Sequence, residues 1–130
     1  RCIDVVCGFF EKDGKVLICK RKPGIKNAGK WEFPGGKVID GESMLRGLRR
    51  EIREELGVEI KISDNLSLLK RVDGKYNLLT YRCTASSPIT ESTDHDELLW
   101  VRKEDISKYD LLDSDQLIVS DLKEKGVLNS

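Results

Sequence analysis

Three glutamates at helical spacing form the pattern in this 130-residue chain that most directly suggests chemistry. Glu51, Glu54 and Glu55 stand at positions i, i+3 and i+4, so an α-helix would place them close together. Like charges one turn apart destabilise a helix by about 0.2–0.5 kcal/mol per pair. Such a face is therefore either an ordinary solvated surface or a site that a cation neutralises. Carboxylates on a rigid element suit Mg²⁺ or Mn²⁺, which use oxygen ligands and bridge to phosphates.

A helix must hold these glutamates, and the surrounding sequence predicts one. Ser43 is the expected N-cap, and Gly57 is the expected residue that ends the helix after Leu56. Apolar residues at i+3 and i+4 spacing predict the stripe that packs on the core, namely Leu45, Leu48, Ile52 and Leu56. The glutamates are then expected on a different face. Gly47 costs up to about 1 kcal/mol against Ala in a helix interior, which a close approach by another element would explain.

The remaining pattern predicts a mixed sheet flanked by helices. Runs rich in β-branched and aromatic residues favour strands at 3–10, 16–21, 31–33, 58–62, 66–72, 76–85 and 98–101. Asp13-Gly14 and Asp73-Gly74 predict turns, and the polar segments 22–30 and 86–96 predict loops. A closing helix is expected over 116–125. Because strands and helices alternate irregularly, we expect a mixed, partly antiparallel sheet, of the α/β (α+β) class, rather than a doubly wound parallel one.

Composition limits the classes of protein to consider. The chain has 23 basic and 23 acidic residues, and this balance argues against a partner that is a nucleic acid polymer or an acidic membrane. The four cysteines form no CxxC pair and the only histidine is His95, expected to be a loop residue, so a zinc site is not predicted. No segment is apolar enough to span a bilayer, and no signal peptide is visible. We therefore expect a single cytoplasmic domain over residues 1–130.

The glutamates also belong to a longer pattern of fixed spacing. Five residues separate Gly36 from Glu42, and seven separate Glu42 from Arg50. The chain then continues as Arg50-Glu51-Ile52-Arg53-Glu54-Glu55-Leu56-Gly57-Val58. This pattern resembles the Nudix box at every defined position, and so many fixed positions make a chance match improbable. The approach, Trp31-Glu32-Phe33-Pro34-Gly35-Gly36-Lys37, is similar to that of MutT-type nucleoside triphosphate pyrophosphohydrolases, and the likeness covers nearly the whole chain.

The resemblance implies a Nudix fold, an α/β/α sandwich, with a metal-dependent hydrolase site. It implies that Mg²⁺, which Mn²⁺ can replace, is held by the carboxylates of Glu51, Glu54 and Glu55, and glycine allows a backbone carbonyl, expected to be that of Gly35, to join them. Arg50 is expected to orient a glutamate of the cluster through a charge-assisted hydrogen bond. Glu42 is expected to position the loop or to add a ligand. The general base is left open between Glu51, Glu54 and Glu97.

The implied reaction converts a nucleoside triphosphate and water to a nucleoside monophosphate and pyrophosphate, by attack on the β-phosphorus. Arg21, at a strand end, matches a position that contacts phosphate in MutT-like enzymes, and Lys37 is a second candidate. Phe33 either lines the base pocket or belongs to the core. Asp115 matches a position that reads the base edge, although it could instead cap the closing helix. MutT-like domains of this size can work as monomers, so we expect a monomer or a weak homodimer.

The substrate is the least determined part of the prediction. An ionised Asp115 accepts hydrogen bonds only, which suits the exocyclic amine of cytosine and favours CTP, dCTP or a modified pyrimidine nucleotide. If protonated in an apolar pocket, the same residue could serve a purine, which makes 8-oxo-dGTP the competing substrate. Two other classes stay open, a nucleotide-sensing Nudix-like domain without turnover and a protein-interaction module with a charged helix.

Overall fold

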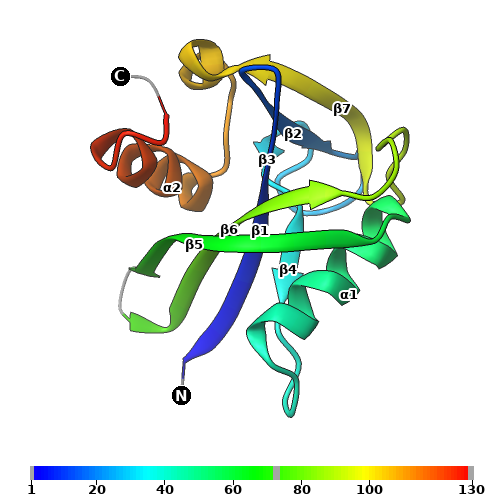
Figure 1. Cartoon of the computed structure of the whole chain (residues 1–130), viewed down its shortest axis with the longest axis vertical. Coiled ribbons are helices and arrows are strands. Elements are labelled where there is room, and N and C mark those ends of the chain that lie inside the picture. The colour runs from blue at the N-terminus through cyan, green and yellow to red at the C-terminus, as the bar shows by residue number, and fades with distance from the viewer. Residues whose placement is uncertain (1, 72–73, 129–130) are drawn as a thin grey trace.

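A mixed sheet lies between two helices in the computed structural model, which describes residues 2–71 and 74–128 (Figure 1). In chain order the elements are β1 (Ile3–Lys12), β2 (Lys15–Arg21), β3 (Trp31–Glu32), β4 (Gly35–Lys37), α1 (Met44–Leu56), β5 (Ile60–Arg71), β6 (Tyr76–Ala85), β7 (His95–Arg102), the 3-10 helix η2 (Lys103–Lys108) and α2 (Asp113–Glu124). The strand order is β3-β2-β1-β6-β5, with β4 paired to β1 and β7 paired to β2. The named strands pair antiparallel except β1 and β6, which run parallel, so the predicted mixed, partly antiparallel sheet is confirmed.

Helix α1 begins and ends where its caps predict. The Ser43 hydroxyl accepts a hydrogen bond from the Arg46 N–H at 3.2 Å, and Gly57 ends the helix in the left-handed region with φ 67°. The predicted apolar stripe was wrong at one position, because Leu45 is 39% exposed. Met44 packs on the core in its place. It lies four residues before Leu48, and the buried residues Leu48, Ile52 and Leu56 continue the same spacing along one face of the helix.

The interior glycine of α1 has the close neighbour that its position predicts. Gly47 is buried, and a Cβ added to it would lie 3.1 Å from a Val38 methyl and 3.1 Å from a Glu42 carboxylate oxygen. The segment that enters α1 therefore folds back against the helix. This contact accounts for the loss of helix propensity at Gly47.

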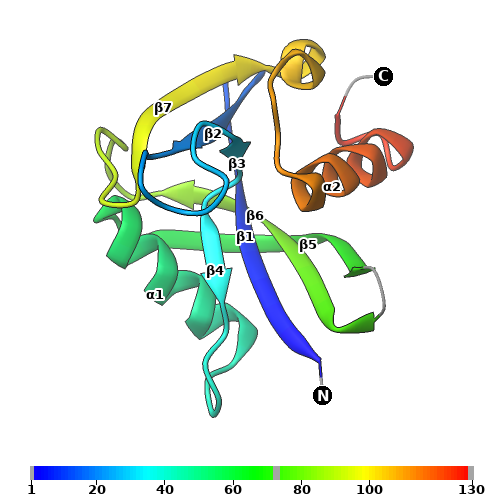
Figure 2. The ribbon, with the colours of Figure 1, turned by 180° about the vertical axis from the view of Figure 1, so that it is seen from behind.

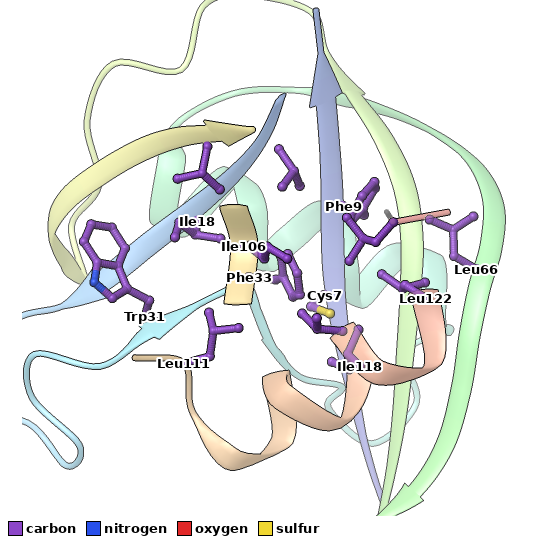
Figure 3. Packing of buried hydrophobic residues seen from close by; sticks show 14 of the residues in the cluster. Cys7, Phe9, Ile18, Trp31, Phe33, Leu66, Ile106, Leu111, Ile118 and Leu122 are labelled. Carbon is purple, nitrogen blue, oxygen red and sulfur yellow. The ribbon is translucent and has the colours of Figure 1, made fainter. Parts of the chain in front are cut away.

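Two apolar clusters fill the two sides of the sheet. One lies between the sheet and α2, where Phe9, Phe33 and Ile118 are nearly inaccessible to water (Figure 3). The other lies between the sheet and α1, and it includes Leu48 and Ile52. The two helices therefore cover opposite faces, as Figures 1 and 2 show.

The sheet opens where β2 leaves β1. Strand β1 pairs with β2 only at its end, through Glu11 and Lys12, while its earlier residues pair with β4 and β6. Between these two halves runs the segment 31–37, which pairs with β2 as β3 and with β1 as β4. This crossing places Glu32 and Lys37, the two polar side chains of the segment, in the pocket lining between the halves.

Several element boundaries differ from those that the sequence predicts. The two strands expected over 58–62 and 66–72 are one strand, β5, with a bulge at Asn65, where polar residues interrupt the apolar pattern. Strand β7 begins at His95 rather than at 98, because His95 and Glu97 pair with the end of β2. The closing helix begins at Asp113, with acidic residues in its first turn, where the helix dipole favours them.

Two short elements were not predicted, and one turn is only partly described. Strand β4 follows the strand that was expected to end at Phe33. The 3-10 helix η2 follows β7 directly. The turn expected at Asp73-Gly74 has its first residue outside the described part of the chain, as does the end of the strand expected to run to residue 72. Among the described residues, each helix is too short or too polar to cross a membrane.

Candidate active site

One pocket of about 640 Å³ contains residues from both halves of the sheet. Its walls include β1 and the segment 31–37, the end of β2 with the loop that follows, and the first turn of α2. Gly35, Gly36 and Glu55 line this pocket together with Phe33 and Asp115, whereas Glu51 and Glu54 are not among its lining residues. The pocket therefore joins the end of α1 that carries the glutamates to the region predicted to hold a base.

The three glutamates of α1 have unequal exposure. The side chain of Glu54 is 60% exposed and that of Glu51 is 18% exposed, whereas Glu55 is buried. The expectation that all three share a face apart from the core was therefore wrong for Glu55, because residue 55 lies beside the buried Leu56 at the edge of the apolar row. Burial and the neighbouring Glu51 raise the pKa of Glu55 to about 9, against the effect of a hydrogen bond from the Gly35 N–H.

The two glycines of β4 bring the backbone against the glutamates. A Cβ on Gly35 would lie 2.0 Å from the Val6 carbonyl oxygen, and the φ of 154° at Gly35 also favours glycine. A Cβ on Gly36 would lie 2.0 Å from a carboxylate oxygen of Glu51. The space left by the missing side chain is thus filled by the Glu51 carboxylate, which explains the need for glycine here.

Arg50 contacts both the loop that precedes α1 and one of the three glutamates on the helix. Its guanidinium donates to both oxygens of Glu42 at 2.7 and 3.0 Å, to Glu54 at 3.0 Å and to the Lys37 carbonyl at 3.0 Å. Glu42 also accepts the Ile39 N–H at 3.0 Å, so it fixes the loop that precedes the helix. The Arg50 bond lowers the pKa of Glu42. Arg50 therefore orients Glu54 while its strongest partner is Glu42, which is not part of the glutamate cluster on the helix.

The chemistry of this donor set fits a hard divalent cation. Carboxylates from α1 stand beside a glycine backbone, and burial raises the pKa of both Glu51 and Glu55, as expected where negative charge lacks a cation. Within the described residues, no three acidic, cysteine or histidine side chains already converge on one point that could hold a metal. The set therefore matches Mg²⁺ or Mn²⁺ by the type of its oxygen ligands rather than by a finished coordination geometry.

A further carboxylate, which the sequence analysis did not select, faces the same glutamates. Asp94 lines the pocket, and its charge contributes to the raised pKa of Glu51 and of Glu55. The residue chosen instead, Glu97, lies in strand β7 opposite Lys20, and its side chain is 52% exposed at 4.0 Å from the Lys20 ammonium. Glu97 does not line this pocket. The strand begins three residues earlier than predicted, which changes the residues that reach the site.

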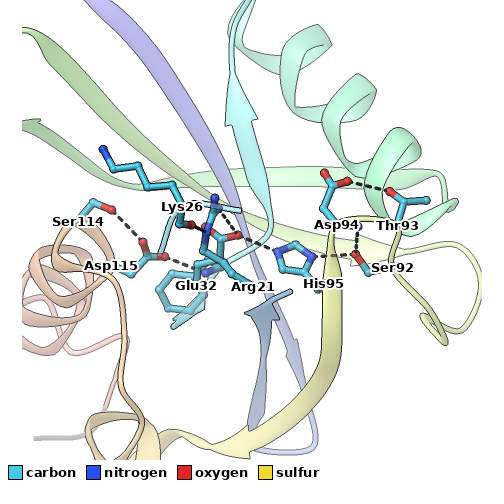
Figure 4. Close-up of polar contacts among 10 residues, drawn as sticks. Arg21, Lys26, Glu32, Ser92, Thr93, Asp94, His95, Ser114 and Asp115 are labelled. Carbon is cyan, nitrogen blue, oxygen red and sulfur yellow. Dashed lines mark hydrogen bonds and ion pairs between the residues drawn. The ribbon is translucent and has the colours of Figure 1, made fainter. Parts of the chain in front are cut away.

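Arg21 belongs to a partly buried polar network that the sequence did not predict. Its guanidinium donates to both carboxylate oxygens of Glu32 at 3.1 and 3.2 Å, and to the Lys26 carbonyl at 2.8 Å (Figure 4). Glu32 also contacts His95 Nε2 at 2.7 Å, and His95 Nδ1 contacts the Ser92 hydroxyl at 2.7 Å. The His95 side chain is 1% exposed, so the expectation of a loop histidine was wrong. In the sequence, the only sign of a special role for His95 was that an acidic residue lies on either side of it.

Asp115 is buried in the pocket and does not cap α2. One of its oxygens accepts the Phe33 N–H at 2.8 Å, and the other accepts the Ser114 hydroxyl at 3.0 Å. The residue at the N-cap position is Leu112, which makes no side-chain cap. Burial raises the pKa of Asp115 to about 7, against the effect of the Phe33 hydrogen bond. Each oxygen keeps a lone pair for a ligand.

The remaining predicted residues lie around the same pocket. Phe33 is 3% exposed and packs against Phe9 with ring centroids 5.9 Å apart, so it belongs to the core and also lines the pocket. Lys37 is exposed on the rim. With Arg21, Lys22 and Lys26, it gives the pocket four cationic lining residues.

Known proteins resemble this chain over most of its length. The NUDIX domain family matches residues 1–124. The CTP pyrophosphohydrolase of Escherichia coli K12 is 34% identical over 117 residues, which cover 88% of this chain and 87% of that protein. A Mycobacterium tuberculosis H37Rv protein named "Putative 8-oxo-dGTP diphosphatase 2" is 32% identical over 125 residues, 91% of this chain and 86% of that protein. The solution structure of the E. coli ORF135 protein superposes with a TM-score of 0.76 at 29% identity, covering 95% of this chain and 90% of that one.

Proposed function

The chain belongs to the Nudix family of enzymes, which hydrolyse phosphoric anhydride bonds, and we propose that it converts a nucleoside triphosphate and water to a nucleoside monophosphate and pyrophosphate. The observation that carries this proposal is the contact of the Glu51 carboxylate with Gly36 and of the Glu55 carboxyl with Gly35, since both glycines line the pocket. Cationic side chains stand on the rim, where a triphosphate would enter.

We propose that Glu51, Glu54 and Glu55 hold Mg²⁺, with Asp94 facing the same ion. Mg²⁺ at this position supplies charge that offsets the phosphates and raises the acidity of a water. Arg50 orients Glu54 and rigidifies the entry to α1, so the carboxylates are fixed before substrate arrives. Arg21 and Lys37 would contact the phosphate chain.

Within the same pocket, Phe33 and Asp115 would receive the base. An ionised Asp115 accepts a hydrogen bond from an exocyclic amine, which favours CTP or dCTP. The similarity to the E. coli CTP pyrophosphohydrolase supports this choice. The pKa of about 7 for Asp115 keeps a protonated form accessible, and a protonated carboxyl can donate to a carbonyl oxygen of an oxidised guanine. That observation favours 8-oxo-dGTP as the second candidate.

A turnover screen tests the proposal. Purified protein with Mg²⁺ is given the common, deoxy- and oxidised nucleoside triphosphates, and the release of pyrophosphate and monophosphate is measured. We expect the highest kcat/KM for CTP or dCTP, and we expect Glu54→Gln to lower the rate by more than about 100-fold. Glu59→Gln is the matched control, because Glu59 is an exposed acid paired with Arg53 outside the pocket.

Two outcomes would contradict the proposal. Equal pyrophosphate release by wild type and Glu54→Gln would show that the glutamates are not the metal site. Calorimetric binding of nucleotides, without turnover under any divalent metal, would identify a nucleotide-sensing domain instead.

A further inference from the structure

The segment that carries Asp94 is tied to the carboxyl end of α1. The Thr93 N–H donates to the Glu55 carbonyl at 2.9 Å, and the Thr93 hydroxyl donates to the Glu54 carbonyl at 3.2 Å. From the other side, the Lys22 ammonium donates to the Thr93 carbonyl at 2.9 Å. The backbone beside Asp94 is thus anchored on the two residues whose side chains we assign to the metal.

A second anchor reaches the same segment through the Ser92 hydroxyl. This oxygen contacts His95 Nδ1 at 2.7 Å and accepts the Asp94 N–H at 3.3 Å. His95 Nε2 contacts Glu32 at 2.7 Å, and Glu32 accepts the Arg21 guanidinium (Figure 4). A neutral imidazole satisfies these contacts when Nε2–H donates to Glu32 and the Ser92 hydroxyl donates to Nδ1. Ser92 then has its lone pairs available for the Asp94 N–H.

We propose that Ser92 and His95 are positioning residues that hold Asp94 toward the metal-binding glutamates. Asp94 is exposed, and its carboxylate accepts a hydrogen bond from the Thr93 hydroxyl at 3.2 Å. Repulsion from the Glu51 carboxylate would turn a free carboxylate away in the absence of a cation. A backbone anchored at Ser92, Thr93 and His95 fixes the position of the Asp94 Cα and so keeps its carboxylate within reach of that site.

The burial of His95 supports a positioning role. Both ring nitrogens of this nearly inaccessible side chain have partners, and its contacts join β3 to the turn before β7. An apolar side chain would fill the same space without fixing the turn. Groups that orient metal ligands in this way typically change metal affinity or activity by about 10- to 100-fold when removed.

The inference rests on the proposed metal site, and Mn²⁺ binding to the substrate-free protein tests it separately from turnover. Free Mn²⁺ is measured by electron paramagnetic resonance during titration of wild type, Ser92→Ala and Asp94→Asn. We expect Ser92→Ala to weaken Mn²⁺ binding by about 10-fold. Ser86→Ala is the matched control, because it removes a hydroxyl that donates to a backbone carbonyl outside this pocket, and it is expected to bind Mn²⁺ as wild type does.

A double variant separates positioning from a general structural effect. If Ser92 acts through Asp94, Ser92→Ala has little further effect on Mn²⁺ binding in the Asp94→Asn background. Full additivity of the two substitutions, or wild-type Mn²⁺ affinity in Ser92→Ala, would overturn the proposal.

Thermal melts check that each variant folds. Because Ser92 is only partly buried, replacing it tests the network with less risk to folding than replacing His95. A protein that binds Mn²⁺ but hydrolyses no nucleotide would refute the proposed function and leave this test intact.

Discussion

Replacing Asp115 by asparagine should stabilise the protein, and more so as the pH rises. Asp115 is 6% exposed, and the asparagine oxygen can still accept the Phe33 N–H that now lies 2.8 Å from the carboxylate. The substitution therefore removes an ionisable group and retains the shape and the main hydrogen bond of the side chain. It isolates the free energy needed to hold a buried negative charge in this pocket.

The size of the effect follows from the two pKa values. Burial raises the pKa of Asp115 from 3.8 to about 7, so the folded protein binds a proton here that the unfolded chain has released. Stability contributed by this proton is complete below pH 3.8 and is lost as the pH rises to about 7. At about 1.4 kcal/mol per pH unit, the loss approaches about 4 kcal/mol. Asp115→Asn avoids this loss.

Urea unfolding between pH 4.5 and 8.5, with a chelator present, measures this difference. The gain in the free energy of unfolding for Asp115→Asn over wild type should grow by about 3 kcal/mol from the lowest to the highest pH. Asp113→Asn is the control, because Asp113 is an exposed acid in the same first turn of α2 and reports the loss of charge at the helix N-terminus. A gain for Asp115→Asn that stays constant with pH would refute the account of a desolvated carboxyl.

Three other substitutions test the site directly. Gly36→Ala should lower pyrophosphate release by at least about 10-fold with nucleotide KM little changed, because its Cβ would displace the Glu51 carboxylate; a kinetic comparison with wild type checks this. Asp94→Asn should reduce kcat far more than Glu97→Gln, since only the first residue lines the pocket; equal losses in steady-state assays would contradict that placement. Arg50→Lys keeps the charge but loses the bidentate hydrogen bonds to Glu42. It should therefore lower kcat and also the melting temperature, measured by differential scanning fluorimetry.

Local patterns predicted the part of the site that lies on one helix. The N-cap at Ser43 and the terminal Gly57 act within one turn of the chain, so their sequence signals specify the ends of α1 directly. The fixed spacing from Gly36 through the glutamates identified the family and the residues beside β4. The burial of Glu55 was missed because helical spacing gives neighbours on the helix and does not say how far the sheet extends over them.

The polar network could not be predicted because strand pairing creates it. Glu32 and His95 are 63 residues apart, and they meet because β3 and β7 both pair with β2. A lone histidine in a polar segment gives no sign of this contact. The sequence also contains no sign that Asp94 lines the pocket while Glu97 lies in β7 opposite Lys20, since that placement depends on how β7 pairs with β2.

The parallel pairing of β1 with β6 has a consequence for how the protein folds as it is synthesised. Ile3 pairs with Tyr76, and the Asn77 amide donates to Asp4 across 73 residues, so the edge of β1 that pairs with β6 has no partner until β6 is made, although β2 and β4 precede it. Closing so long a loop costs entropy before the contacts offset it, which slows folding. Until then the apolar residues of β1 are exposed in the nascent chain, and they are a target for chaperones or for aggregation. Substitutions that weaken the β1–β6 pairing should therefore reduce soluble yield in cells before they alter catalysis in the purified enzyme.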